Sequence, residues 1–134
     1  MTTDKLLPRA ADHAFFNKLA VKLLKSLEKS DCSVDVLFLD NASLRDLKKR
    51  YKKKEAKYVN VLAFPAGTDF PHPDKEGKHL GEIYINARMA KKDSPMGVKM
   101  LVHGLAHLLG HDHMNAKEEK EMLEMEKKLL RVAK

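Results

Sequence analysis

The segment from Pro95 to Leu109 constrains the fold more than any other part of the chain. Its apolar side chains recur at helical spacing around nearly the whole circumference of a helix. Ser94 is suited to cap the first turn, and a proline at the first helical position loses no hydrogen bond there. Because a helix with so little polar surface has to be covered, the sequence predicts a buried central helix.

The other segments mix helical and strand patterns. We expect strands over residues 33–40, 58–64 and 80–85, and a loop over residues 66–78. We expect a first amphipathic helix over residues 15–27. A second should follow a cap at Asn41 or Ser43, with Leu44, Leu47 and Tyr51 on one face. A last one should follow Asn115, with an apolar stripe of Met122, Met125, Leu129 and Val132. The regular alternation and glycine fingerprint of nucleotide-binding doubly wound sheets are missing. The sequence therefore predicts an α+β fold with a small mixed sheet packed against helices.

Size and composition limit the class of protein. With 134 residues, 43% of them hydrophobic, the chain is expected to form a single domain over residues 1–134, with an extended or poorly ordered amino-terminus over residues 1–8. No apolar run is long enough to span a bilayer and no export signal is recognisable, which favours the cytoplasm. Cys32 is the one cysteine, so an intrachain disulfide and a four-thiolate zinc site are both excluded.

The charge of the chain favours a polyanionic partner. The formal net charge is +7, and seven Lys or Arg residues fall within residues 48–57, interleaved with Tyr51 and followed by Tyr58. This run is either a solvated helix end and loop, or a groove that follows a phosphate backbone while a base stacks on a tyrosine. Its position near the histidines described next favours the groove.

Histidines are concentrated in the sequence H-G-L-A-H-L-L-G-H-D-H, which runs from His103 to His113. Residues four apart lie on the same side of a helix, so His103 and His107 can bind one ion. Gly110 is placed to end the helix in a left-handed conformation, which brings His111 or His113 back toward that ion. Three imidazoles leave a fourth position open on Zn²⁺, as in catalytic zinc sites.

The cluster and its neighbours allow other interpretations. A single histidine on an apolar helix face is usually a core residue whose ring nitrogens are satisfied, but the spacing here argues against that interpretation. Zinc peptidases share the spacing, yet they carry a glutamate base after the first histidine, where this chain has Gly104. Asp112 is either a turn carboxylate, or a group that orients a ligand imidazole or accepts a proton from metal-bound water.

These residues resemble the YbeY-type endoribonucleases, also called rRNA maturation factors, whose signature H-G-x-x-H-L-x-G-x-D-H is matched from His103 to His113. N-V-L-A-F-P over residues 60–65 and L-G-E-I-Y-I over residues 80–85 are similar to two further family segments. The resemblance covers roughly residues 14–132. It implies one zinc ion per chain held by His103, His107 and His113, and no nucleotide cofactor.

The resemblance also implies single-strand RNA cleavage in the maturation of small-subunit ribosomal RNA and in ribosome quality control. The expected partners are precursor ribosomal RNA and the small ribosomal subunit, with no membrane partner. Two competing hypotheses are a zinc-containing RNA- or ribosome-binding factor without efficient catalysis and, with weaker support, a zinc peptidase.

This chain departs from the family at positions expected to line the cleft. The family has an arginine in a Y-R-x-K pattern, and either Lys52 or Lys53 takes its place. Lysine keeps the charge but cannot form a bidentate contact with phosphate, so activity is expected to be weak. Val59 and Ala63 replace a threonine and a serine, and the family's first strand is truncated before Pro8.

The mechanism that these residues predict starts with RNA in a basic groove and a zinc ion that binds a phosphate oxygen. The nucleophile is either the metal-bound hydroxide or the ribose 2′-OH. Lysine then stabilises the added negative charge. The predicted catalytic residues are Lys52, Lys53 and Asp112, and the predicted RNA-binding residues are Lys48, Lys49, Arg50, Lys54 and Lys57.

Overall fold

The computed structural model describes residues 10–52, 56–66, 78–89, 91, 94–110 and 115–133. The predicted amino-terminal extension and most of the predicted loop lie outside the described residues. In chain order the elements are α1 (Ala10–Ser26), β1 (Cys32–Leu39), α2 (Asn41–Lys52), β2 (Val61–Pro65), β3 (Lys78–Asn86), a 3₁₀ turn (Ala87–Met89), α3 (Pro95–Leu108) and α4 (Ala116–Ala133). Each predicted helix and strand is present, with ends that shift by a few residues.

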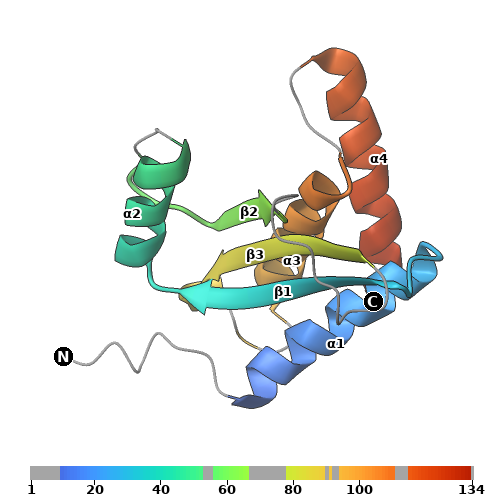
Figure 1. Cartoon of the computed structure of the whole chain (residues 1–134), viewed down its shortest axis with the longest axis horizontal. Coiled ribbons are helices and arrows are strands. Elements are labelled where there is room, and N and C mark those ends of the chain that lie inside the picture. The colour runs from blue at the N-terminus through green and yellow to red at the C-terminus, as the bar shows by residue number, and fades with distance from the viewer. Residues whose placement is uncertain are drawn as a thin grey trace.

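The three strands form one mixed sheet in the order β1-β3-β2 (Figure 1). β1 pairs with β3 in parallel, and β2 pairs with β3 in antiparallel. A parallel pair needs a long crossover, and here the chain between β1 and β3 supplies α2 and β2 on the way. The mixed sheet confirms the predicted α+β class.

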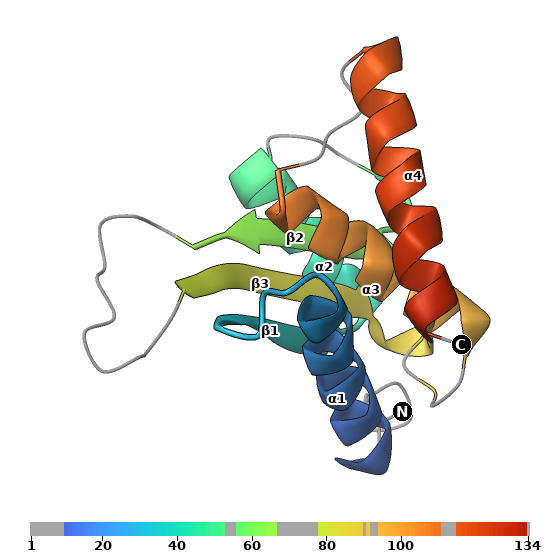
Figure 2. The same cartoon turned by 90° about the vertical axis from the view of Figure 1, so that its right-hand side faces the viewer.

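The main core lies between one face of the sheet and three helices. Phe16 and Leu23 of α1, Leu101 of α3 and Leu129 of α4 are fully buried with Ile83 of β3. Figure 2 shows α1, α3 and α4 gathered on this side of the strands. The prediction of a largely buried α3 is therefore confirmed. A smaller cluster of Leu44, Val59 and Leu62 lies under α2 on the other face.

Both ends of α3 follow the sequence signals. The Ser94 hydroxyl accepts a hydrogen bond from the Gly97 backbone N–H at 3.3 Å, and Pro95 is the first helical residue. The helix ends at Leu108, and Gly110 adopts a φ of 97° while its N–H donates to the His107 carbonyl at 3.0 Å. Gly110 therefore ends the helix as predicted.

The start of α2 differs from the prediction, because Asp40 rather than Asn41 or Ser43 is the cap. The Ser43 backbone N–H donates to Asp40 Oδ1 at 2.7 Å. Asn41 instead donates through Nδ2 to the Lys57 carbonyl and accepts from the Val59 N–H at 3.0 Å. These bonds, with one from Asn86 Nδ2 to the Val59 carbonyl at 3.0 Å, hold the chain before β2 in place. They explain why β2 begins three residues later than the predicted strand.

Replacing Asp40 by alanine is expected to lower the free energy of unfolding by about 1 kcal/mol, the usual effect of losing a helix cap. The backbone hydrogen bond from Ser43 lowers the pKa of Asp40 below its ordinary value. A depressed pKa means that the stabilisation is present above the unfolded-state pKa of about 3.9 and is lost as pH falls through the folded-state value. Urea unfolding at pH 7 and at pH 3 measures both effects, and an equal difference between wild type and Asp40→Ala at the two pH values contradicts the assignment.

None of the helices in the described part of the chain is both long and apolar enough to cross a membrane.

Candidate metal centre

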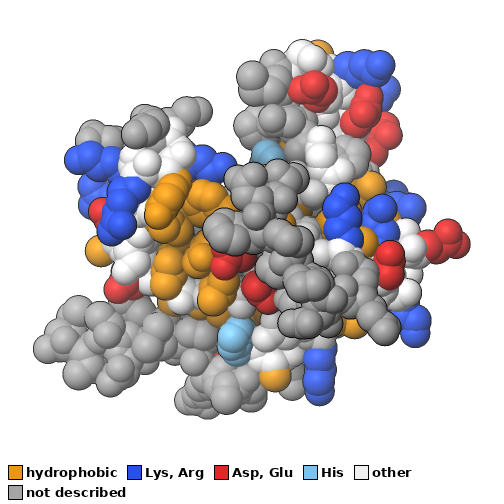
Figure 3. Space-filling view, in the orientation of Figure 1, with side chains coloured by type: hydrophobic (Ala, Val, Ile, Leu, Met, Phe, Trp, Pro, Cys, Tyr) orange, Lys and Arg blue, Asp and Glu red, His pale blue; other side chains and the backbone are white. Residues whose placement is uncertain are grey.

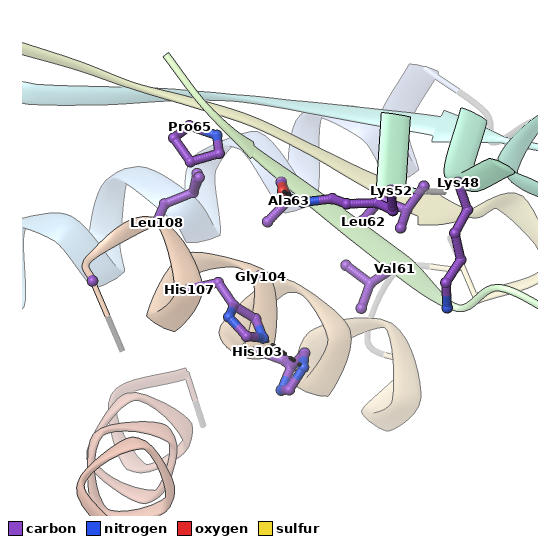
Figure 4. A pocket seen from close by; sticks show the side chains of 11 residues that line it. Lys48, Lys52, Val61, Leu62, Ala63, Pro65, His103, Gly104, His107 and Leu108 are labelled. Carbon is purple, nitrogen blue, oxygen red and sulfur yellow. Dashed lines mark hydrogen bonds between the residues drawn. The ribbon is translucent and has the colours of Figure 1, made fainter. Parts of the chain in front are cut away.

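A cleft of about 540 Å³ lies between α2, β2 and α3. His103 and His107 enter it from α3, and Lys48 and Lys52 of α2 stand on the opposite side (Figure 4). The lining residues are Lys48, Lys52, Val61, Leu62, Ala63, Pro65, His103, Gly104, His107, Leu108 and Gly110. Three segments that are far apart in the sequence therefore form one concave site.

His103 and His107 point their ring nitrogens at each other, as Figure 4 shows. The two Nε2 atoms are 3.2 Å apart, and the ring planes are almost perpendicular, at 85°. In a tetrahedral site with Zn–N bonds near 2.05 Å, two ligand nitrogens are about 3.3 Å apart. The spacing of this pair therefore fits two ligands of one zinc ion.

Glu126 of α4 supports the first histidine from behind. Its Oε1 lies 3.0 Å from His103 Nδ1, and the two side chains are only 15% and 31% exposed. Because a carboxylate only accepts hydrogen bonds, this contact places the proton on Nδ1 and leaves the lone pair of the neutral ring on Nε2, toward His107. Carboxylates hold metal-binding histidines in this way in many zinc sites.

The third predicted ligand, His113, lies outside the described residues, as do His111 and Asp112. Within the part of the chain that the structure describes, no group of three or more His, Cys, Asp or Glu side chains is arranged to hold a metal ion. The spacing of His103 and His107 alone would provide two of the three predicted ligands.

Gly104 packs against the sheet. A Cβ atom at this position would lie 2.7 Å from Ile83 Cγ2, and Ile83 is fully buried. The absence of a side chain lets α3 approach β3 closely, which fixes the height of His103 and His107 above the sheet. A glutamate base, as in the zinc peptidases, therefore has no room here without a shift of the core.

The structure separates the predicted basic residues into groups. Lys48 and Lys52 are four apart on α2 and both line the cleft. Lys52 Nζ lies 3.4 Å from the Ala63 carbonyl oxygen. Arg50 is paired with Asp46 on the exposed surface of α2, with Nη2 at 2.6 Å from Oδ2.

Lys49 lines a separate hollow beside Arg45, and Lys57 Nζ lies 5.9 Å from the Tyr58 ring centroid. Lys53 and Lys54 are outside the described residues. Of the predicted basic residues that are described, the cleft brings only Lys48 and Lys52 to the histidines.

Sequence reasoning missed Glu126. A glutamate in an amphipathic helix is an ordinary surface residue, and 23 positions separate it from His103. Its one signal is position, because Glu126 follows Met122 by four residues and directly follows Met125, so it borders the buried stripe of α4. A carboxylate at the edge of a buried stripe is a candidate partner for a histidine of the helix packed against it.

Comparison with known proteins gives a consistent result. A family model described as Endoribonuclease YbeY matches residues 3–134. The Endoribonuclease YbeY of Myxococcus xanthus is 35% identical over 116 residues, which are 80% of this chain and 38% of that protein. Its counterpart in Acholeplasma laidlawii is 33% identical over 114 residues, which are 78% of this chain and 77% of that one. This chain thus spans well under half of the Myxococcus protein but most of the Acholeplasma protein.

Two further matches extend over nearly the whole chain. The Endoribonuclease YbeY of Aquifex aeolicus is 32% identical over 135 residues, covering 94% of this chain and 87% of that protein. The solution structure of a Thermotoga maritima protein superposes with a TM-score of 0.56 at 24% sequence identity, covering 95% of this chain and 86% of the other, which supports the fold. By the family model and these relatives, the chain belongs to the YbeY family of endoribonucleases.

Proposed function

We propose that this chain is a zinc-dependent endoribonuclease that cuts single-stranded RNA during small-subunit rRNA maturation and ribosome quality control. The observation that carries the proposal is the facing pair of Nε2 atoms, 3.2 Å apart, in a cleft whose other wall carries Lys48 and Lys52. Family membership supports the endoribonuclease class. One zinc ion per chain would be held by His103, His107 and His113, and the partners would be precursor rRNA and the small ribosomal subunit.

A divalent ion at the histidines would supply a Lewis acid and lower the pKa of a bound water. Glu126 keeps His103 in the tautomer that presents Nε2 to the cleft. Val61, Ala63 and Pro65 of β2 line the cleft on the side of the sheet. These groups fix the position of the reacting phosphate before any bond changes.

Lys52 is the described residue best placed to bind that phosphate. Its Nζ is 3.4 Å from the Ala63 carbonyl and 4.9 Å from the Phe64 ring centroid, so the side chain is held across β2. An ammonium group at this place offsets the negative charge that builds up on the phosphate. We propose Lys53 and Asp112 as further catalytic residues, and Lys48, Lys49, Arg50, Lys54 and Lys57 as contacts to the RNA backbone.

The form of the cleft supports a preference for single strands. It is a concave site between α2, α3 and the edge strand β2, and the proposed ligands His103 and His107 line it. An unpaired strand can turn its backbone into such a site, whereas an A-form duplex keeps its phosphates on a wide, regular surface. Cleavage is therefore expected in loops and unpaired segments.

Replacing Lys52 by alanine tests the proposed contact. We expect cleavage of single-stranded RNA to slow roughly tenfold, and the slope of log affinity against log salt to fall by about one, as for the loss of one phosphate contact. Lys52→Arg should retain or exceed wild-type activity, because a guanidinium can bind phosphate with two hydrogen bonds.

The matched control for this test is Lys22→Ala, which removes an exposed lysine from α1, away from the cleft. Equal effects of Lys52→Ala and Lys22→Ala would rule out a specific contact at Lys52. End-group analysis of the products identifies the nucleophile, because attack by the ribose 2′-OH leaves a cyclic phosphate and attack by water does not.

A further inference from the structure

A second pocket, of about 290 Å³, lies on the face of the sheet opposite the histidine cleft. It is lined by Leu47, Tyr51, Phe64, Glu82 and Tyr84. Figure 3 shows hydrophobic side chains gathered between α2 and the strands, next to the Lys and Arg side chains of α2. None of these residues takes part in the proposed metal site.

The two pockets share β2 as a common wall. Ala63 faces the histidine cleft and Phe64 faces the second pocket, because successive side chains of a strand point to opposite faces. β2 is an edge strand of the sheet that the described residues form. Lys52 lies at this edge, in contact with the Ala63 carbonyl and with the Phe64 ring. A nucleic acid chain bound at Lys52 can therefore reach both pockets.

The aromatic side chains of the pocket are arranged to accept a flat ring. The centroids of Tyr51 and Phe64 are 5.9 Å apart and those of Phe64 and Tyr84 are 5.7 Å apart, with ring planes at 80° and 81°. Tyr51 is 64% exposed although it belongs to this cluster. An edge-to-face contact covers a face of only one of the two rings, so the exposed Tyr51 can offer a face to a nucleobase, as aromatic rings do in proteins that bind single strands.

Glu82 gives the pocket a polar group that distinguishes between bases. Its Oε2 accepts a hydrogen bond from the Tyr84 hydroxyl at 3.2 Å, and burial raises the pKa of Tyr84, so that this hydroxyl stays protonated. The carboxylate has a second oxygen and accepts hydrogen bonds only. Guanine presents two adjacent donors, N1–H and N2–H₂, on its Watson–Crick edge. In the other three bases each donor on that edge has an acceptor next to it, which a carboxylate repels.

We propose that the pocket of Tyr51, Phe64, Glu82 and Tyr84 binds a guanine base of the RNA substrate, next to the nucleotide whose phosphate reaches Lys52. The proposal rests on the proposed function, since it assigns a base preference to the same RNA site. The base stacks on Tyr51, and Glu82 accepts from N1–H and N2–H₂. Cleavage of an RNA of random sequence is then enriched for guanine at one fixed distance from the cut.

The first experiment measures binding without cleavage. The full-length protein is titrated with guanosine, adenosine, cytidine and uridine monophosphates, and the aromatic ring signals of Tyr51, Phe64 and Tyr84 are followed by NMR. Guanosine monophosphate is expected to shift these signals and to bind at least about fivefold more tightly than uridine monophosphate, the lower end of what a specific base contact contributes. If none of the four nucleotides shifts the ring signals of Tyr51, Phe64 or Tyr84, the proposal is overturned.

Two variants separate stacking from recognition. Tyr51→Leu is expected to weaken guanosine monophosphate binding at least about fivefold, whereas Tyr58→Leu, which removes a tyrosine of similar exposure at 62%, should leave the guanine preference unchanged. Glu82→Gln keeps the shape but presents one acceptor and one donor, so the preference for guanine over uridine should fall to about one. Glu121→Gln removes the same charge from the exposed side of α4 and should preserve the preference.

The outcomes separate this proposal from the function it rests on. If RNA binds and is cut with no guanine preference, or if Glu82→Gln retains the preference, the guanine pocket is wrong while the nuclease assignment stands. If the nucleotide shifts appear but RNA is not cut by the zinc-loaded protein, the pocket stands and the nuclease assignment fails. A fixed guanine beside the cut that disappears in Glu82→Gln supports both.

Discussion

Replacing His107 by alanine is expected to lower the rate of RNA cleavage at least about a hundredfold and to lower the zinc content of the purified protein. Removal of a group that only supports a metal ligand costs ten- to a hundredfold, so loss of a ligand should reach or exceed the upper end. The Nε2 atom of His107 faces that of His103 at 3.2 Å, and no other described residue replaces it. Elemental analysis and a cleavage assay on unpaired and paired RNA give the two readouts.

The control for this variant is His13→Ala, which removes an imidazole from α1, where its Nε2 lies 2.8 Å from the Val36 carbonyl. Circular dichroism and RNA affinity of His107→Ala should match those of the wild type. Undiminished cleavage by His107→Ala would identify a contaminating nuclease. Zinc binding without cleavage by the wild type under any metal condition would instead support an RNA- or ribosome-binding factor.

Replacing Glu126 by leucine is expected to weaken zinc binding ten- to a hundredfold. The carboxylate is 85% shielded from solvent and holds the Nδ1 proton of His103, so its loss frees the ring to rotate and to change tautomer. The zinc affinity of Glu126→Gln should fall between those of the wild type and Glu126→Leu, because an amide oxygen accepts the same hydrogen bond without a charge. Competition with a chromophoric chelator measures the dissociation constant.

A purely structural role for Glu126 predicts a different pattern. In that case Glu126→Leu would change the urea midpoint but leave the ¹⁵N signal of His103 Nδ1 and the zinc affinity unaltered. Glu124→Leu, at an exposed position on the same helix, controls for the added hydrophobic side chain. Equal zinc affinities for Glu126→Leu and Glu124→Leu would contradict the positioning role.

The parts of the fold that the sequence predicts well are those set by neighbouring residues. The cap at Ser94, the proline after it and the turn at Gly110 each depend on a few consecutive positions, and the structure has all three. The strands of the sheet were recognisable from composition and flanking turns. The spacing of His103 and His107 likewise follows from helix geometry alone, and it is the part of the candidate site that the structure reproduces most directly.

What the sequence does not predict depends on partners far along the chain. The sequence offers Asn41 or Ser43 as the cap of α2, but the Asn41 amide bonds to residues near β2 and the Ser43 N–H donates to Asp40, which is the cap. Glu126 gains its role only because α4 packs beside α3. Asn41 and Glu126 each have a plausible role within their own helix, as a cap and as a surface residue. Sequence patterns within one helix therefore do not reveal that these side chains bond to residues elsewhere in the chain.

The arrangement of the basic run, residues 48–57, can be predicted from the sequence only in part. Helical periodicity alone places Lys48 and Lys52 on one side of α2, and Leu47 and Tyr51 on the adjacent side. That spacing was available in the sequence and sorts the lysines that line the cleft from Lys49 and Arg50, which do not. The direction in which that side faces could not be known before α2 was placed against β2.

The close contact between Gly104 and Ile83 has an evolutionary consequence. Zinc peptidases carry a glutamate where this chain has Gly104, and a Cβ atom there would lie 2.7 Å from Ile83 Cγ2, so either the core shifts or residue 83 becomes smaller. Truncating a fully buried isoleucine typically costs about 2–5 kcal/mol, a large share of the stability of a small domain. A descendant of this scaffold can therefore gain a glutamate at position 104 only together with a rearranged core, so that single substitution carries a cost in stability.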